Sequence, residues 1–291
     1  MRFDIRQTTT YTYPEPVCGS EQVMRLQPLS RPHQRVIASS LMLAPHPVSR
    51  NDSVDFFGNA TTAALIAEPH RELKITTHAR VDVDRPAQSA PTPPWEDVCA
   101  EAVNARDLSP ESPVHFTFTS PLVPLLVPVR EYVRRSFTKG RPIFDAALDV
   151  TQRMRADFKY DSTATDVTTP VVQSFAARAG VCQDFAQIMI SGLRGLGVPA
   201  GYVSGYLRTD PPPGKPRLEG ADAMHAWVRV WCGTTAGWRE FDPTNGIAVS
   251  DDHIILAVGR DYLDVSPTVG TLRTYGRHSI AIAVDVTPVA Q

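Results

Sequence analysis

The sequence has little cysteine and lacks any long apolar run. Its four cysteines, Cys18, Cys99, Cys182 and Cys232, are widely spaced and form no CxxC pair, which argues against a disulfide-stapled scaffold. No stretch approaches the roughly 20 apolar residues that cross a bilayer, and the opening residues, MRFDIRQTTTYTY, lack the apolar core of a secretory signal. We therefore expect a cytoplasmic protein with reduced thiols and no membrane partner.

An excess of charge of either sign is also missing. The formal net charge is −2 and the sequence pI is about 6.4, with Lys and Arg scattered along the chain. Because a nucleic-acid-binding protein needs clustered basic residues, no nucleic-acid partner is expected. The spacing of His225 and Cys232 matches no zinc pattern, and no D-x-D-x-D-G loop is present, so neither a zinc site nor calcium activation is expected.

What is present first is a β-rich segment over residues 1–85. The stretch HRELKITTHARVDV alternates apolar and polar residues as a half-buried strand does, and FDIRQTTTYTY and RVIASSLMLAP have similar texture. Turn signals occur at Tyr13-Pro14, at residues 45–47 and at residues 57–59. These features predict a small antiparallel β-sandwich domain. The proline-rich residues 86–94 that follow predict a linker, or an extended arm lying on one of the units.

Residues 95–291 have a different texture and predict an α+β domain. Apolar residues recur at helical spacing in WEDVCAEAVNA and in PIFDAALDVTQRMRADFKY. The later segments AGYVSGYLRT, HAWVRVWC, GWREFDPT and HSIAIAVDVTPV are rich in β-branched and aromatic residues and predict strands. Helices followed by an antiparallel sheet are typical of the α+β class.

Cys182 stands at the start of a predicted helix in the stretch RAGVCQDFAQIMISGLRGLGVPA. Gly180 separates this helix from the preceding element, and Gly197 and Pro199 mark its end. A helix N-terminus favours a thiolate there, since its unpaired backbone N–H groups and its dipole attract negative charge. The alternative is an inert core thiol, because free cysteine is often buried.

Two residues further along the chain favour the nucleophile. His225 opens the predicted strand HAWVRVW, and Asp242 ends the next strand, GWREFDPTNG. Adjacent strands joined by the turn CGTTAG would bring these side chains together. In an acyl-transfer site an imidazole takes the thiol proton and a carboxylate fixes the orientation of the ring. The three residue types therefore predict a Cys-His-Asp triad.

The segments GVCQDFAQIMISGLRGLGVPAGYVSGYL, HAWVRVW and GWREFDPTNG together resemble the bacterial transglutaminase-like superfamily. HIILAVGRDYLDVSPTVG, MRLQPLSRPHQ and FFGNA extend the resemblance over nearly the whole chain. The resemblance implies Cys182 as nucleophile, His225 as general base and Asp242 as orienting carboxylate. It also implies a papain-like α+β core preceded by a β-sandwich domain, as in cysteine peptidases of this kind.

Further residues are candidates for supporting roles. The backbone N–H of Cys182 is one expected oxyanion donor. Tyr160 offers a hydroxyl just before the site or packs in the core, and Gln183 and Asp184 directly follow the nucleophile, with Asp184 also suited to the helix dipole. Trp227 either lines an apolar cleft or belongs to the core, as does Trp238. The proline-rich residues 208–223 are long enough to border the cleft.

Three functions remain open from the sequence. The first is a cysteine peptidase or amidase that hydrolyses a peptide or isopeptide bond in a peptide or protein substrate. The second is a protein-glutamine gamma-glutamyltransferase, in which a lysine amine resolves the acyl-enzyme. The third is a catalytically idle binding module on the same fold. Hydrolysis is preferred by analogy, no cofactor is required, and the oligomeric state is not indicated.

Overall fold

The computed structural model describes residues 1–85, 91–209 and 222–289. Two four-stranded antiparallel sheets form a β-sandwich, with strand orders β15-β1-β6-β3 and β14-β2-β5-β4. The strands are β1 (Arg2–Val17), β2 (Ser20–Met24), β3 (Gln34–Ala44), β4 (Ser49–Val54), β5 (Ala60–Ile66), β6 (His70–Val83), β14 (Thr268–Leu272) and β15 (Ser279–Pro288). Alternate residues of β1 and β6 point inward, as the sequence pattern predicts.

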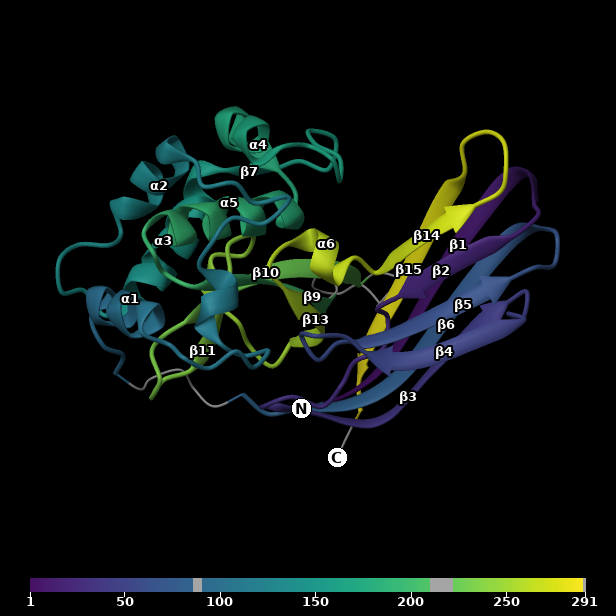
Figure 1. Ribbon diagram of the computed structural model, residues 1–291, viewed down its shortest axis with the longest axis horizontal. Coiled ribbons are helices and arrows are strands. Elements are labelled where there is room, and N and C mark those ends of the chain that lie inside the picture. The colour runs from purple at the N-terminus through teal and green to yellow at the C-terminus, as the bar shows by residue number, and fades with distance from the viewer. Residues whose placement is uncertain (86–90, 210–221, 290–291) are drawn as a thin grey trace, which may run out of the picture.

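The sandwich is not built from the N-terminal segment alone. β15 pairs with β1 from Phe3 opposite Pro288 to Thr12 opposite Ser279, and β14 pairs with β2. Figure 1 shows these two C-terminal strands lying within the sandwich. The assignment of residues 95–291 to a single α+β domain is therefore wrong for residues 268–288, because local periodicity identifies a strand but not the sheet that it joins.

The turn predicted at Tyr13-Pro14 is also wrong, since β1 continues through it to Val17. Pairing with β6 is irregular between Thr12 and Val17. Proline has no N–H to donate to the hydrogen-bond ladder, so a strand tolerates proline where its pairing is irregular.

A five-stranded antiparallel sheet of order β12-β11-β10-β9-β13 forms the centre of the α+β part. Its strands are β9 (Ala200–Leu207), β10 (Ala223–Trp231), β11 (Trp238–Asp242), β12 (Ile247–Ala248) and β13 (His253–Gly259). The helices are α1 (Trp95–Val103), α2 (Val127–Arg134), α3 (Ile143–Asp157), α4 (Val171–Ala177), α5 (Cys182–Gly195) and α6 (Tyr262–Val265), with a 3₁₀ turn at Pro113–Phe116 and a short parallel pair, β7 (Lys159–Tyr160) and β8 (Ala179–Gly180). None of the helices in the described ranges is long and apolar enough to span a membrane.

Helix α5 is the central helix of this part. The sequence predicts one apolar face, but every residue from Asp184 to Arg194 is buried. Phe185, Met189 and Leu193 pack in the core that α5 shares with β9 and β10. Arg194 is satisfied by the carbonyl oxygens of residues 118, 200 and 260 and by the Ser120 hydroxyl. The helix is therefore held on all sides, which fixes the position of its first residue.

The sandwich covers the other face of the five-stranded sheet, so that this sheet lies between the helices and the sandwich (Figure 1). One continuous core joins residues of β1, β6 and β15 to Tyr206 of β9 and to Ile254 and Leu256 of β13. Strands β9 and β13 are consequently buried on both faces.

Two side-chain amides of the sandwich also pair with the edge strand β13. Gln34 Nε2 donates to the Ile255 carbonyl oxygen at 2.9 Å, and the Ile255 N–H donates to Gln34 Oε1 at 2.7 Å. Asn59 makes the same two-bond contact with Val258, at 2.8 Å each way. These amides satisfy an edge that would otherwise leave buried backbone groups unpaired.

The predicted linker lies partly in the described chain. The Pro93 carbonyl oxygen accepts from the Ile143 N–H, and Thr92 Oγ1 accepts from the Phe144 N–H. Residues 92–94 thus form an arm lying on the start of α3. Residues 86–90, and residues 210–221 of the predicted cleft-bordering segment, lie outside the described residues.

The edge contact predicts a stability effect. Gln34→Ala leaves a buried N–H and a buried C=O of Ile255 without partners, and we expect it to lower the free energy of unfolding by about 2–4 kcal/mol. Urea unfolding measures this change. Gln27→Ala is the matched control, because the Gln27 amide donates to Ser39 at the surface and accepts a long 3.4 Å bond from Thr62, whose hydroxyl also donates to Asp52. It should change stability by less than about 0.5 kcal/mol. Equal losses in the two variants would contradict a stabilising role for the Gln34–Ile255 hydrogen bonds.

Candidate functional site

Cys182 is the first residue of α5, and the turn before it is fixed by Asp184. The Asp184 carboxylate Oδ2 accepts from the Val181 N–H at 2.9 Å and from the Thr165 hydroxyl at 2.6 Å. A Cβ on residue 180 would lie 2.5 Å from this oxygen, so Gly180 is needed for the close approach. Asp184 therefore positions the helix start, and its negative charge complements the helix dipole.

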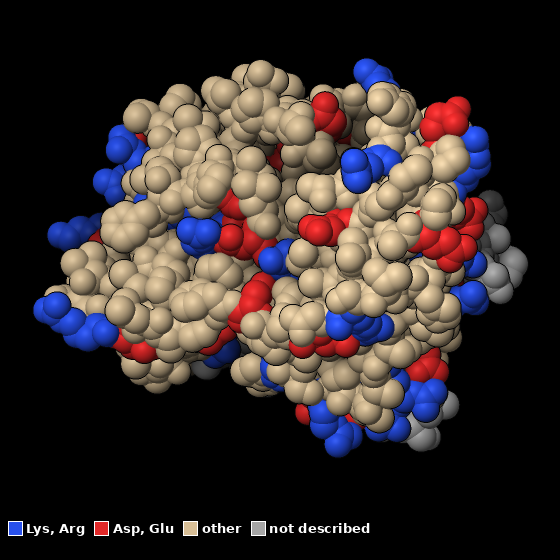
Figure 2. Space-filling model, turned by 45° about the vertical axis from the view of Figure 1, so that its right-hand side comes forward, with Lys and Arg blue, Asp and Glu red and all other residues tan. Residues whose placement is uncertain are grey.

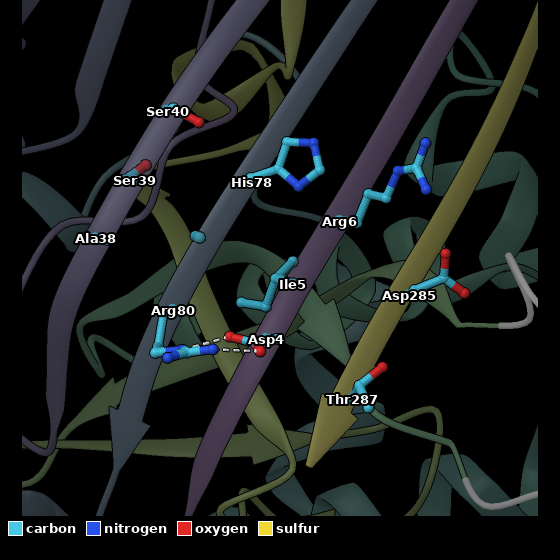
Figure 3. A pocket seen from close by; sticks show the side chains of 11 residues that line it. Asp4, Ile5, Arg6, Ala38, Ser39, Ser40, His78, Arg80, Asp285 and Thr287 are labelled. Atoms are coloured by element: carbon cyan, nitrogen blue, oxygen red, sulfur yellow. Dashed lines mark hydrogen bonds and ion pairs between the residues drawn. The ribbon is translucent and has the colours of Figure 1, made fainter. Parts of the chain in front are cut away.

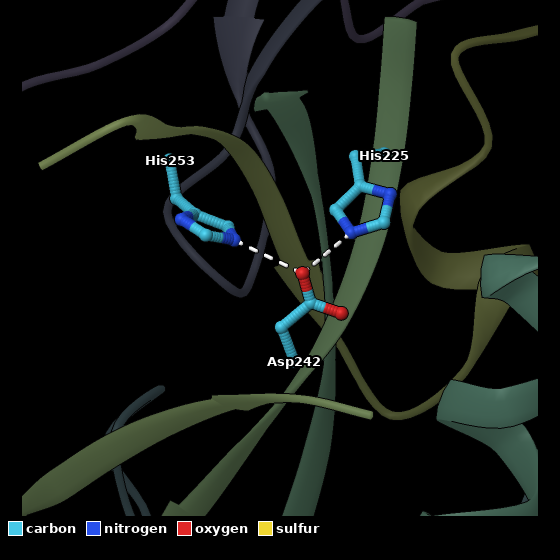
Figure 4. A group of neighbouring side chains, drawn as sticks. All are labelled: His225, Asp242 and His253. Carbon is cyan, nitrogen blue, oxygen red and sulfur yellow. Dashed lines mark hydrogen bonds and ion pairs between the residues drawn. The ribbon is translucent and has the colours of Figure 1, made fainter. Parts of the chain in front are cut away.

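His225 and Asp242 come together across two neighbouring strands, as the sequence predicts. His225 lies near the start of β10, Asp242 is the last residue of β11, and their strands pair in antiparallel register. The His225 Nε2–H donates to Asp242 Oδ2 at 2.8 Å (Figure 4). This bond leaves Nδ1 as the ring nitrogen that faces away from the carboxylate.

A second histidine, His253, binds the same carboxylate oxygen and was not identified from the sequence. Its Nε2–H donates to Asp242 Oδ2 at 3.1 Å, and Figure 4 shows the two rings approaching the carboxylate from two sides. His253 Nδ1 accepts from the Ser250 N–H at 3.4 Å, which defines the tautomer. The signal in the sequence is only a histidine opening the apolar strand HIILAVG, and the contact depends on how distant strands are ordered in the sheet.

Asp242 is fully buried and has further donors. Its Oδ1 accepts from the Thr244 and Asn245 N–H groups, and its Oδ2 also accepts from Asn245 Nδ2 at 2.6 Å. Burial opposes ionisation of this carboxyl, but the hydrogen bonds from His225 and His253 outweigh it and hold its pKa below the ordinary value. The carboxylate is therefore charged and fixed in direction.

The thiol of Cys182 lies close enough to the His225 ring to influence its pKa. Burial disfavours the charged form of His225, but hydrogen bonds to Asp242 and Cys182, with the charges of both partners, raise its pKa to about 10. The structure thus brings together Cys182, His225 and Asp242 from a helix and two strands. Since Nε2 is bound to Asp242, Nδ1 is the nitrogen available to the thiol.

The remaining sequence candidates lie at different depths. Tyr160 is 54% exposed beside the thiol, and its pKa is raised by burial and by the Cys182 charge. Gln183 is half-buried, and its Nε2 donates to the Val167 carbonyl oxygen at 3.3 Å, away from the histidines.

Trp227 is fully buried in a hydrophobic core, so of the two alternatives the core position holds and the cleft position does not. Its Nε1 donates to Glu240, and its ring packs edge-on against His253 with centroids 5.2 Å apart. The sandwich covers the face of the sheet on which Trp227 lies, and the alternation of β10 alone does not reveal this cover. Trp227 therefore packs against the rings of both His225 and His253.

His225, Asp242 and His253 also place their ligand atoms within 4.8 Å of one another, a grouping capable of holding a metal ion. The atoms that face each other are already joined by hydrogen bonds of 2.8 and 3.1 Å. These hydrogen bonds orient the imidazole of His225. On the face shown in Figure 2, charged side chains of both signs are scattered and form no single basic or acidic patch.

Asp242→Asn tests the coupling between the buried carboxylate and His225. The stability that comes from the raised pKa of His225 is complete below 6.5 and is lost as pH rises through about 10, whereas that of Asp242 is complete above 3.8. The loss in unfolding free energy caused by Asp242→Asn should therefore be largest between about pH 4 and 6.5 and should shrink toward pH 10. Urea unfolding across this range measures it. Asp149→Asn, at a half-exposed ion pair, should show no such window.

Comparisons with known proteins agree with this architecture. Residues 3–82 match the family model for the bacterial transglutaminase-like N-terminal region, and residues 130–243 match that for the transglutaminase-like superfamily. An uncharacterized protein of Mycobacterium tuberculosis is 38% identical over 99% of this chain and 93% of its own length. Another, of Mycobacterium leprae, is 30% identical over 99% of both chains.

A protein-glutamine gamma-glutamyltransferase of Pseudomonas aeruginosa is 37% identical over 25% of this chain and 11% of its own length. Among solved structures, a candidate cysteine protease from Cytophaga hutchinsonii has the same fold, with a TM-score of 0.75, 20% identity, and coverage of 100% of this chain and 91% of that one. The chain belongs to the transglutaminase-like superfamily and carries the bacterial N-terminal region of that family.

Proposed function

We propose that the protein catalyses thiol-dependent acyl transfer at peptide or isopeptide amide bonds, with water as the acceptor. The observation that carries the proposal is a single imidazole held between two partners. His225 is bound through Nε2 to a buried carboxylate, and its ring lies within reach of a thiol at the start of a helix. This arrangement is what nucleophilic acyl transfer by cysteine requires.

In the first half of the proposed reaction, the Cys182 sulfur attacks the carbonyl carbon and the thiol proton passes to His225 Nδ1. The tetrahedral intermediate collapses when the C–N bond breaks, and the imidazolium gives its proton to the leaving amine. Asp242 keeps Nδ1 directed at the sulfur and stabilises the imidazolium. The Cys182 N–H, in the first turn of α5, is a donor for the developing oxyanion.

In the second half, His225 takes a proton from water, the hydroxide oxygen attacks the thioester carbonyl, and the carbon–sulfur bond breaks. The acid leaves and the thiol is regenerated with the proton from His225. If a lysine amine attacks instead of water, the product is a cross-linked amide. The short match to a protein-glutamine gamma-glutamyltransferase makes a lysine amine the alternative acceptor to test.

The acceptor and the nucleophile are tested together by mass spectrometry of glutamine-containing peptides incubated with the protein and a primary amine. We expect the hydrolysed acid as the main product, and a loss on the order of 10⁴-fold or more in Cys182→Ala because the thiol is the attacking group. If the amine adduct is the main product, the function is cross-linking and not hydrolysis. Turnover by Cys182→Ala would remove the thiol mechanism.

The other cysteines are internal controls for the thiol. Cys18 is exposed, whereas burial raises the pKa of Cys99 to about 11 and that of Cys232 to about 12. Iodoacetamide at pH 7 should modify Cys182 faster than Cys18, because the imidazole of His225 lies beside Cys182. It should spare Cys99 and Cys232, because the raised pKa of each thiol keeps it protonated. Cys18→Ser should keep full activity. An order in which Cys18 reacts first would mark Cys182 as an ordinary thiol.

His253 is a positioning residue for this reaction, because it holds the carboxylate that orients His225. His253→Leu removes a hydrogen bond to a charged group and should lower kcat about 10–100-fold with little change in KM. His253→Gln places an amide N–H near the former Nε2 and should restore most of the rate. Steady-state kinetics on both variants, with urea unfolding as a check on the fold, measure the effect. Equal losses in kcat for the two variants would reduce His253 to a packing role.

A further inference from the structure

A cavity of about 430 Å³ lies between the sandwich and the five-stranded sheet, and we call it the interdomain pocket. Arg31 and Arg85 line it from the sandwich side, and Arg229 of β10 with Trp238 and Glu240 of β11 line it from the sheet. Nothing in the proposed acyl transfer uses these arginines.

Arg229 is almost completely buried at 4% exposed. Its guanidinium lies 4.4 Å from the Phe116 ring centroid and 4.2 Å from that of Trp238. Nη1 donates to Glu111 at 2.9 Å, but Nε and Nη2 have no hydrogen-bond partner among the described residues. A buried donor of a charged group is costly to leave unpaired, so this side chain lacks an acceptor.

The other two arginines show the same shortage. The Arg85 side chain is 8% exposed, with Nη1 at 3.4 Å from Glu240 and Nη2 donating to the His253 carbonyl oxygen at 3.4 Å. Arg31 Nη2 donates to Gly58 and Asn59. The Nε of each is buried, and no partner for either is found in residues 1–85, 91–209 or 222–289.

The charges of the pocket do not balance. Four arginines, the fourth being Arg239, face two carboxylates, Glu111 and Glu240, and the Glu111 side chain is 54% exposed. Burial lowers the pKa of Arg229, and the positive charge of Arg31 adds to this effect, while Glu111 and Glu240 oppose it. An anion in the pocket would relieve the repulsion and accept the unpaired N–H groups.

The contrast with a larger groove on the outer face of the sandwich is informative. That groove, about 610 Å³, contains Arg80 bound to Asp4 by two hydrogen bonds of 2.6 and 2.7 Å (Figure 3). Arg6 stands opposite Asp285 in the strand register, and Figure 3 shows the two on neighbouring strands. Its charges are matched and partly exposed, so it offers no comparable demand for an anion.

We propose that the interdomain pocket binds a carboxylate, carried either by a small organic acid or by the C-terminus of a peptide. A guanidinium offers the paired donors that fit a carboxylate, and the buried side chains of Ile255 and Val258 in the lining suit an apolar body attached to it. The two glutamates limit the excess positive charge and favour a singly charged group over phosphate. The proposal is independent of the acyl-transfer activity.

The test measures the Tm of the full chain with benzoate, benzamide or inorganic phosphate at constant ionic strength. Benzoate at ten times its dissociation constant should raise the Tm by about 3 °C, since a ligand that binds only the folded state stabilises it. Benzamide has the same shape without the charge and should produce no shift. N-acetylphenylalanine compared with its C-terminal amide shows whether a peptide carboxylate is also accepted. Equal shifts with benzoate and benzamide, no shift with benzoate, or a shift with phosphate alone would overturn the proposal.

Variants locate the site. Arg85→Gln and Arg229→Gln should each weaken benzoate binding about tenfold or more, because each removes a charged donor. Arg80→Gln, in the outer groove, is the matched control and should bind normally, as should Cys182→Ala. If Arg229→Gln does not fold, Arg85→Gln decides the result. Unchanged binding in Arg85→Gln, or equal weakening in Arg80→Gln, would place the carboxylate elsewhere.

Discussion

The site depends on one buried carboxylate that collects hydrogen bonds from three parts of the chain. Asp242 accepts from His225 on β10, from His253 on β13 and from the turn at residues 244–245. A buried carboxylate is stable in its charged form only when hydrogen-bond donors of the protein replace the water around its oxygens. In the sheet order β11-β10-β9-β13, the two histidines come from strands that are not neighbours. The carboxylate therefore ties the orientation of the His225 ring to the assembly of the whole sheet.

The position of the sulfur depends on a second buried acid. Asp184 closes the turn before Cys182, and Gly180 leaves the space that this turn requires. Enclosure of α5 on all sides then prevents the helix from shifting relative to β9 and β10. The positions of Cys182 and His225 are therefore set by a packed helix and a packed sheet before any substrate arrives. Preorganisation of this kind lowers the cost of reaching the reactive geometry.

Local signals in the sequence were sufficient to predict that Cys182, His225 and Asp242 lie near one another, but they did not identify the side chains that support them. Gly180 and the apolar spacing after Cys182 define a helix start, and the short turn between β10 and β11 makes neighbours of the strands that carry His225 and Asp242. His253 could not be found this way, because its contact requires β13 to join the sheet beyond β9. Nothing in its own strand specifies that order.

The same limit explains the errors in the fold prediction. β15 reads as a strand, but only its long-range pairing with β1 shows that it belongs to the sandwich. The alternation of β10 leaves open whether Trp227 lines a cleft or packs in the core, and it packs in the core because a second layer covers that face. Periodicity reports one face of one element, whereas domain membership depends on residues far away in the chain.

The N-terminal sandwich is therefore part of the structure that holds the candidate site. Gln34 and Asn59 satisfy the backbone of β13, the strand that begins with His253. Arg85, at the end of the sandwich segment, donates its N–H to Asp251 and its Nη2 to the His253 carbonyl oxygen. Removing the sandwich would expose this edge and the apolar surface of Ile254 and Leu256 together. The proline-rich residues 86–94 separate the β-rich part of the sequence from the α+β part. Because the two parts share a core, we do not expect either to fold without the other.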